Sequence, residues 1–240
     1  MRMYLKSMNK GFTLIELLIA MAISGVIMTG VYSAFKSQQD SYLAQEQVAE
    51  MQQTIRASLD IMTREIRMAG FRGVADSDAN IKDAQIDAIY FSLDINEDGN
   101  TTDDDDDDGE NIGYDLYDSA TTGPLTLGRS SSKSLITLTE TPASSGHYEA
   151  LYHQPFAQNI EELEFFYTLE DGSKTTAPAT PSEIRSVQIS ILARANKPDR
   201  NYTNTQTYTS ASLVDWTPAT PDNFRRRFQT MTVNCRNMGL

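Results

Sequence analysis

A single carboxylate, Glu16, interrupts an otherwise apolar stretch near the start of the chain. Residues 12–35 carry no other charged side chain, and as an α-helix they would extend about 36 Å, enough to cross the hydrocarbon core of a membrane. A charge at the centre of a bilayer costs about 2.5 to 3.5 kcal/mol. We therefore expect Glu16 to have a function and a positively charged partner.

A short basic segment precedes this apolar stretch. Arg2, Lys6 and Lys10 occur without any acid in residues 1–11, which predicts that this leader stays in the cytoplasm while the rest of the chain faces outward. The apolar character continues beyond the small residues that could imitate a signal-peptide cleavage site. The span is therefore expected to remain attached.

The sequence GFTLIE at residues 11–16 resembles the cleavage and methylation motif of type IV prepilins and type II secretion pseudopilins. The resemblance implies that a prepilin peptidase cuts between Gly11 and Phe12 and that the new Phe12 amine is methylated. Glu16 would then pair with the Phe12 ammonium of a neighbouring subunit, because an unpaired charge is costly at low dielectric. A plain single-span anchor with an acid near the headgroups is the alternative.

Apolar residues recur at spacings of three and four beyond residue 35, which is typical of one face of a helix. They are Val48, Met51, Ile55, Leu59, Met62, Ile66 and Ala69. Gly70 follows where a glycine commonly ends a helix. We predict one helix over residues 12–69, in which residues 12–35 form the membrane or filament-core part and residues 36–70 pack on a folded domain. A free coiled coil is the alternative for the second part.

Residues 71–240 are expected to form one β-rich domain outside the cytoplasmic membrane, because their length suits a single core. Alternating or β-branched segments predict strands at residues 86–93, 111–117, 135–139, 160–169, 184–193 and 229–233. Residues 197–222 are rich in Thr, Pro and Asn and are predicted to be a surface loop. The expected fold is α+β, with a long N-terminal α-helix on a mostly antiparallel β-sheet.

Ten acidic residues lie between residues 94 and 110. The pattern D-x-N-x-D-G at residues 94–99 is typical of calcium loops, in which alternate oxygen-bearing side chains converge on the cation. The candidate Ca²⁺ ligands are Asp94, Asn96, Asp98, Asn100, Asp105 and Glu110. The six aspartates at residues 103–108 are, as a run, more simply interpreted as solvated charge. Ca²⁺ is thus a possible ligand and not a required cofactor.

Other chemistry is sparse in the sequence. The formal charge of −13 disfavours nucleic acid as a partner, and no nucleophile elbow, zinc spacing or phosphate loop is present. His147 and His153 are the two histidines, and Cys235 has no second cysteine for an internal disulfide. The Arg-rich residues 225–227 are interpreted as a solvated turn, or as a contact for another subunit's acidic loop. We expect no enzymatic activity.

The size of the chain, the acidic loop between early strands and the Arg-rich approach to its C-terminal end resemble the PilW family of minor pilins. This resemblance implies a minor pilin at or near the tip of a type IV pilus, which helps to prime assembly. Its partners would be other pilins, prepilin peptidase, the inner-membrane assembly platform and a tip adhesin. It would lie in the inner membrane before assembly and in a cell-surface pilus afterwards. A J-type pseudopilin of type II secretion and a membrane-anchored, non-polymerising calcium-dependent binding module are the alternatives.

Overall fold

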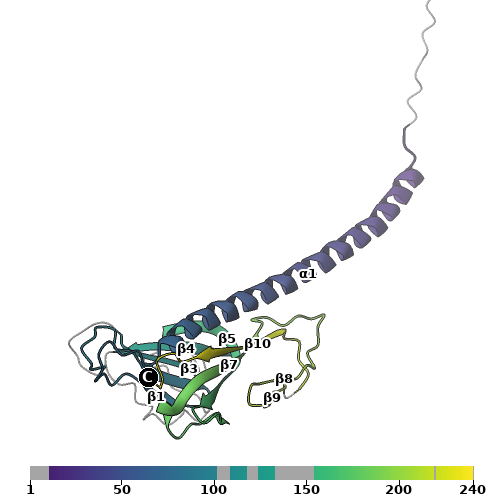
Figure 1. The fold of residues 1–240 in the computed structure, drawn as a ribbon. Helices are drawn as coiled ribbons and strands as arrows, with labels where there is room; N and C mark the ends of the chain where they lie inside the picture. The colour runs from purple at the N-terminus through teal and green to yellow at the C-terminus, as the bar shows by residue number, and fades with distance from the viewer. Residues whose placement is uncertain (1–10, 102–108, 118–123, 133–153, 219, 240) are drawn as a thin grey trace, which may run out of the picture. The chain divides into compact units, whose positions relative to one another are not determined.

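The computed structural model describes residues 11–101, 109–117, 124–132, 154–218 and 220–239 (Figure 1). The chain divides into two compact units, Met1–Glu46 and Gln47–Leu240. One long helix, α1 (Leu14–Met68), runs through both. It confirms the predicted single helix, which ends within two residues of the expected limits. Gly70 follows α1 with a φ of 71°, a left-handed conformation that glycine adopts without steric cost.

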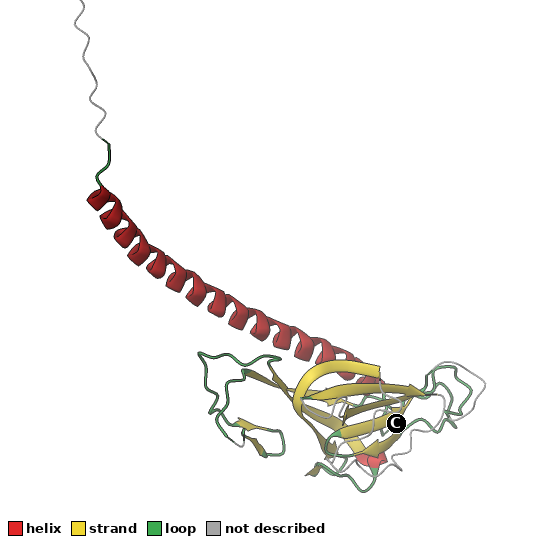
Figure 2. Cartoon of the chain, turned by 180° about the vertical axis from the view of Figure 1, so that it is seen from behind, coloured by secondary structure: helices red, strands yellow, loops and turns green. Residues whose placement is uncertain are grey.

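Eight strands form one antiparallel sheet in the order β1-β2-β3-β4-β5-β7-β10, with β6 paired to β5. They are β1 (Ile81–Ala84), β2 (Ala88–Ser92), β3 (Asn111–Tyr117), β4 (Leu125–Ser132), β5 (Gln154–Leu169), β6 (Lys174–Thr175), β7 (Ile184–Arg194) and β10 (Arg226–Asn234). A short 3-10 helix, η1 (Pro181–Glu183), precedes β7. A separate hairpin pairs β8 (Tyr208–Thr209) with β9 (Asp215–Trp216). Figure 2 shows the same elements from behind.

The core lies between the sheet and the C-terminal half of α1. From the helix, the predicted stripe contributes the buried residues Met51, Ile55, Leu59, Met62 and Ile66. The strands contribute buried residues that include Phe91, Tyr114, Phe165 and Ile189, which pack against the stripe. The predicted α+β class, with the helix on a mostly antiparallel sheet, is therefore confirmed.

The strand predictions succeeded where the apolar signal is continuous. The expected bounds of β3 match, and β2, β5, β7 and β10 lie at predicted segments with shifted ends. The prediction missed β1, which is short, and β4, whose serines and Gly128 hide its alternation. A Cβ added at Gly128 would lie 2.9 Å from the Tyr117 ring, so the strand has no room for a side chain there. The strand predicted at residues 135–139 lies outside the described residues.

Candidate functional site

Thr13 and Glu16 cap the N-terminal end of α1 through reciprocal hydrogen bonds. The Thr13 backbone N–H and hydroxyl donate to Glu16 Oε2 at 2.8 and 2.9 Å, and the Glu16 N–H donates to Thr13 Oγ1 at 3.3 Å. This arrangement is a capping box, for which T-x-x-E is the sequence signature. The sequence analysis missed this role, although residues 13–16 carry the signature.

The helix that follows exposes its apolar side chains. Leu14, Leu18, Val26 and Phe35 are all exposed, and the helix is long and apolar enough to cross a membrane, with a mean hydropathy of 2.2 in its most apolar window. Exposed apolar surface of this extent requires a membrane or other protein as its environment. Because a single chain is present, the pairing of Glu16 with Phe12 of another subunit stays a prediction.

Asp94 begins the predicted calcium loop and is fully buried. Its Oδ2 accepts a hydrogen bond from the Gly73 N–H at 3.2 Å. Its Oδ1 is buried and has no hydrogen-bond partner among the residues that the structure describes. A buried carboxylate oxygen in this state is costly, because it has lost water without gaining a donor.

The following residues form consecutive side-chain turns. The Asp98 N–H donates to Asn96 Oδ1 at 3.0 Å, and the Asn100 N–H donates to Asp98 Oδ1 at 2.8 Å. Gly99 has a φ of 89°, which agrees with the sharp turn expected there. The Asn96 and Asp98 side chains thus stabilise two successive turns of the backbone.

Glu110 approaches this loop from the start of β3. Its Oε1 accepts hydrogen bonds from the Ile95 and Asn96 N–H groups at 2.7 and 3.2 Å. Burial raises the pKa of Glu110, and the charges of Asp94 and Asp98 raise it further. Glu110 therefore lies close to two of the other predicted ligands.

The calcium site is not shown by this geometry. Among the described residues, no group of three or more Asp, Glu, His and Cys side chains could hold a metal ion. Asp105 lies outside the described residues. Calcium binding at residues 94–110 therefore stays a prediction.

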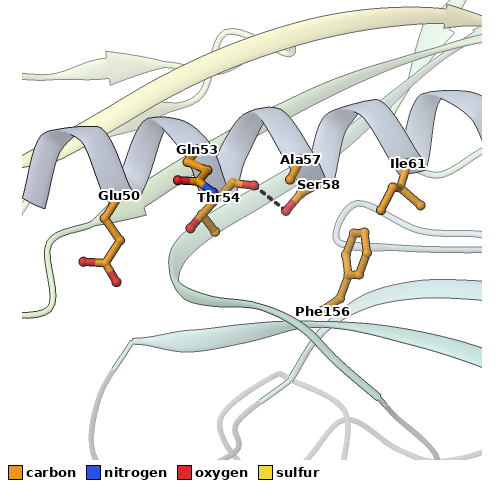
Figure 3. Close-up of a pocket in the computed structure, with 7 residues that line it drawn as sticks. All are labelled: Glu50, Gln53, Thr54, Ala57, Ser58, Ile61 and Phe156. Atoms are coloured by element: carbon orange, nitrogen blue, oxygen red, sulfur yellow. Dashed lines mark hydrogen bonds between the residues drawn. The ribbon is translucent and has the colours of Figure 1, made fainter.

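A groove of about 410 Å³ lies between α1 and the start of β5 (Figure 3). It is lined by Glu50, Gln53, Thr54, Ala57, Ser58, Ile61 and Phe156. The Ser58 hydroxyl donates to the Thr54 carbonyl oxygen at 2.8 Å. Among the described lining residues, Glu50 is the one ionisable residue.

Cys235 is buried in the core. Burial raises the pKa of Cys235 to about 12, so its thiol stays protonated and unreactive at neutral pH. His147 and His153 lie outside the described residues.

The Arg-rich segment is not a solvated turn. Arg226 is buried and binds Asp222 and Glu161, with Nη2 2.7 Å from an oxygen of each. Arg225 binds Asp199 at 2.8 Å and lies over the Tyr202 ring. Arg225 and Arg226 therefore bind acids of their own chain. For these two residues, the interpretations as a solvated turn and as a contact for another subunit's acidic loop are both wrong.

Residues 44–210 match the family described as prepilin peptidase-dependent protein B, and residues 6–32 match the prokaryotic N-terminal methylation motif. A solved structure of a type IV-like pilin from Thermus thermophilus is similar, with 15% identity, coverage of 78% of this chain and 97% of that chain, and a TM-score of 0.42. No curated protein matches the chain.

A methylation motif at the head of a long helix that packs on an antiparallel sheet defines the class of type IV pilins and pseudopilins. Within that class, the chain belongs to the prepilin peptidase-dependent protein B family. Membership implies processing by prepilin peptidase and assembly of the pilin type. The family is structural rather than catalytic, and the apolar helix is consistent with membrane anchoring before assembly.

Proposed function

We propose that this protein is a minor pilin of the PilW type, which is processed at Gly11 and Phe12 and joins a type IV pilus near its tip. The observation that carries the proposal is the exposed apolar half of α1, which begins within the motif at residues 11–16. Such a surface suits a membrane before assembly and a bundle of like helices afterwards.

After cleavage, Glu16 would also bind the Phe12 ammonium of a neighbouring subunit. Before cleavage, its carboxylate caps α1 through Thr13. A carboxylate offers about four acceptor positions, so it can keep the Thr13 bonds and also accept the new Phe12 ammonium of a neighbouring subunit. Burial of that pair among apolar helices would make an unpaired Glu16 costly and so favour correct register.

Two substitutions separate capping from pairing. Glu16→Gln keeps a capping box, because glutamine also bonds the N-cap residue, but it removes the charge. Thr13→Ala removes the cap and keeps the charge. We expect Glu16→Gln to be cleaved normally and to be absent from sheared filaments, whereas Thr13→Ala is still incorporated. Mass spectrometry of the Phe12 terminus checks processing in each variant, and normal incorporation of Glu16→Gln would refute the pairing.

The type of filament has its own test. Deletion of this protein should reduce the number of surface pili while protein secretion continues. Unchanged pili with a loss of exoprotein secretion would instead assign the chain to a type II secretion pseudopilus of the J type. Protein found in the inner membrane and never in sheared filaments would support the non-polymerising binding module.

We also propose that the loop at residues 94–100, together with Glu110, binds Ca²⁺. The supporting observation is the buried Asp94 Oδ1, to which none of the described residues donates a hydrogen bond. Asn96, Asp98 and the Asn100 carbonyl would add the neutral and charged oxygens that Ca²⁺ prefers.

Thermal unfolding of the full chain in detergent tests this site. At about 100 times its Kd, Ca²⁺ stabilises a protein by about 2.7 kcal/mol, which raises Tm by about 5 to 10 °C for a domain of this size. Asp98→Asn should remove the shift, whereas Asp60→Asn on the exposed face of α1 should retain it. Equal Tm values in millimolar Ca²⁺ and in chelator would rule the site out.

A further inference from the structure

The turn of the β8–β9 hairpin exposes an apolar side chain on a strained backbone. Leu213 is 82% exposed, and its φ is 68°. Its neighbour Val214 is also exposed. A bulky residue rarely adopts a positive φ, and strain of this kind occurs preferentially at functional sites. Neither the pilin motif nor the acidic loop uses this turn.

Hydrogen bonds within the turn fix its conformation. The Ser210 N–H donates to the Val214 carbonyl oxygen at 2.8 Å, and the Leu213 N–H donates to the Ser210 carbonyl oxygen at 3.1 Å. The Val214 N–H donates to the Ser210 hydroxyl oxygen at 3.2 Å. Leu213 is therefore presented by an ordered turn.

A buried carboxylate supports the turn from below. Glu164, on β5, is 1% exposed. It accepts hydrogen bonds from the Ser210 hydroxyl at 2.8 Å, the Ser212 N–H at 3.0 Å and the Ser212 hydroxyl at 2.5 Å. Burying a carboxylate is costly unless it is well bonded, so these three bonds hold the turn against the sheet.

Aromatic contacts fix the two strands of the hairpin. The Trp216 and Phe228 rings lie edge to face, with centroids 5.8 Å apart, and the Tyr208 and Phe228 centroids are 6.3 Å apart. Figure 1 shows the hairpin beside β10 and outside the large sheet. The exposed Leu213 thus lies on a support that is preorganised for binding, which lowers the entropic cost of association.

We propose that Leu213 and Val214 dock into an apolar pocket of a different pilin-class subunit, a pocket with a basic residue at its rim. This inference rests on the proposed function. The charge next to the turn favours such a partner, because Asp215 is exposed beside Val214 and residues 201–217 contain no Lys, Arg or His. An anionic membrane surface would repel this segment, and a second copy of a chain of charge −13 would repel it as well.

Three substitutions separate docking from folding. Leu213→Asn removes the apolar group and suits a positive φ, since asparagine is enriched in that conformation. We expect it to raise Tm by about 2 to 4 °C and to lower incorporation into sheared filaments by roughly tenfold. Leu213→Met keeps an apolar side chain and should be incorporated normally. Ile86→Asn, which changes an exposed apolar residue in another loop, is the matched control and should also be incorporated normally.

A photo-crosslinking amino acid at position 213 of the full chain in cells identifies what the turn contacts. A crosslink to a different subunit that carries an N-terminal methylation motif, weakened by Asp215→Lys, would support the docking. A crosslink to lipid or to a second copy, the absence of any crosslink, or normal incorporation of Leu213→Asn would overturn it. Glu16→Gln run in parallel distinguishes the two proposals. If Glu16→Gln blocks incorporation while Leu213→Asn does not, the docking alone fails. If the unmodified protein is itself absent from sheared filaments, the filament function fails.

Discussion

The two halves of α1 have the same backbone conformation and opposite relations to water. In the first half, apolar residues such as Ile27 are exposed. In the second half, a stripe that includes Ile55 is buried against the sheet. Among the described residues, the sheet covers the second half of α1, whereas exposed apolar surface like that of the first half is typical of a contact with a membrane or with other protein. The buried second half of α1 thus contributes to folding, and the exposed first half is the part available for assembly.

Two acids on the helix show the same contrast. Glu16 is satisfied locally, by Thr13 three residues away. Glu65 is satisfied across the core, where Arg129 Nη2 lies 2.9 Å from its Oε1 and the Tyr114 hydroxyl donates to its Oε2. Loss of Glu65 should therefore affect folding, whereas loss of Glu16 should affect assembly.

The largest expected effect comes from a matched pair of isoleucines on α1. Ile55→Ala should lower the free energy of unfolding of the domain by about 2 to 5 kcal/mol, because it leaves a cavity in the core. Ile27→Ala changes a side chain that is 59% exposed and should alter it by less than about 0.5 kcal/mol. Chemical denaturation of the full chain in detergent measures both. Similar losses for the two variants would contradict the contrast between the halves.

A smaller loss is expected from Glu65→Ala. It removes the carboxylate that accepts hydrogen bonds from Arg129 and Tyr114 where α1 packs on the sheet, and this should lower the free energy of unfolding by about 1 to 3 kcal/mol. Asp60→Ala breaks an exposed pair with Arg64 on the same helix and should cost at most about 0.5 kcal/mol. Thermal melts of both variants provide the comparison, which fails if the exposed pair proves equally important.

The next largest expected effect is a loss of stability at acidic pH, through protonation of Asp222 beside Arg226. The hydrogen bond from Arg226 is the main cause that holds the pKa of Asp222 below its usual range. A carboxylate with a lowered folded-state pKa stabilises the protein above its unfolded pKa, near about 3.9, and this contribution is lost as the pH falls through the folded value. Tm measured from pH 6 to pH 2 should therefore fall below about pH 4. Asp222→Asn should reduce that dependence, and an unchanged slope would refute the assignment.

The smallest expected effect on stability comes from the ionisation of Cys235 at alkaline pH. Its folded-state pKa of about 12 exceeds the unfolded value of about 8.5, so its contribution to stability is complete below about pH 8.5 and declines as the pH rises. At pH 8, alkylation of the folded chain should be roughly a thousandfold slower than that of the denatured chain. Rapid modification of the folded protein would show that the thiol is accessible.

Much of the fold could be predicted from local patterns. The stripe from Met51 to Ile66 and the alternating or β-branched segments of β5 and β7 predicted α1 and the centre of the sheet, because burial imposes a period on such segments. The pattern fails for β4, where Gly128 accommodates the Tyr117 ring, and for β8 and β9, which are two residues long. β4 is fixed by its pairing with β3 and β5, and the β8–β9 hairpin is fixed by its contacts with Phe228 on β10 and with Glu164 on β5.

The candidate sites divide in the same way. The sequence by itself determined the motif at residues 11–16 and the turn at Gly99, since both depend on residues a few positions apart. Only the tertiary structure decided that Arg226 binds Glu161 and that Glu164 holds the turn that exposes Leu213. These contacts join residues 65 and 48 positions apart, and a buried charge finds its partner through packing in space, which no local pattern records.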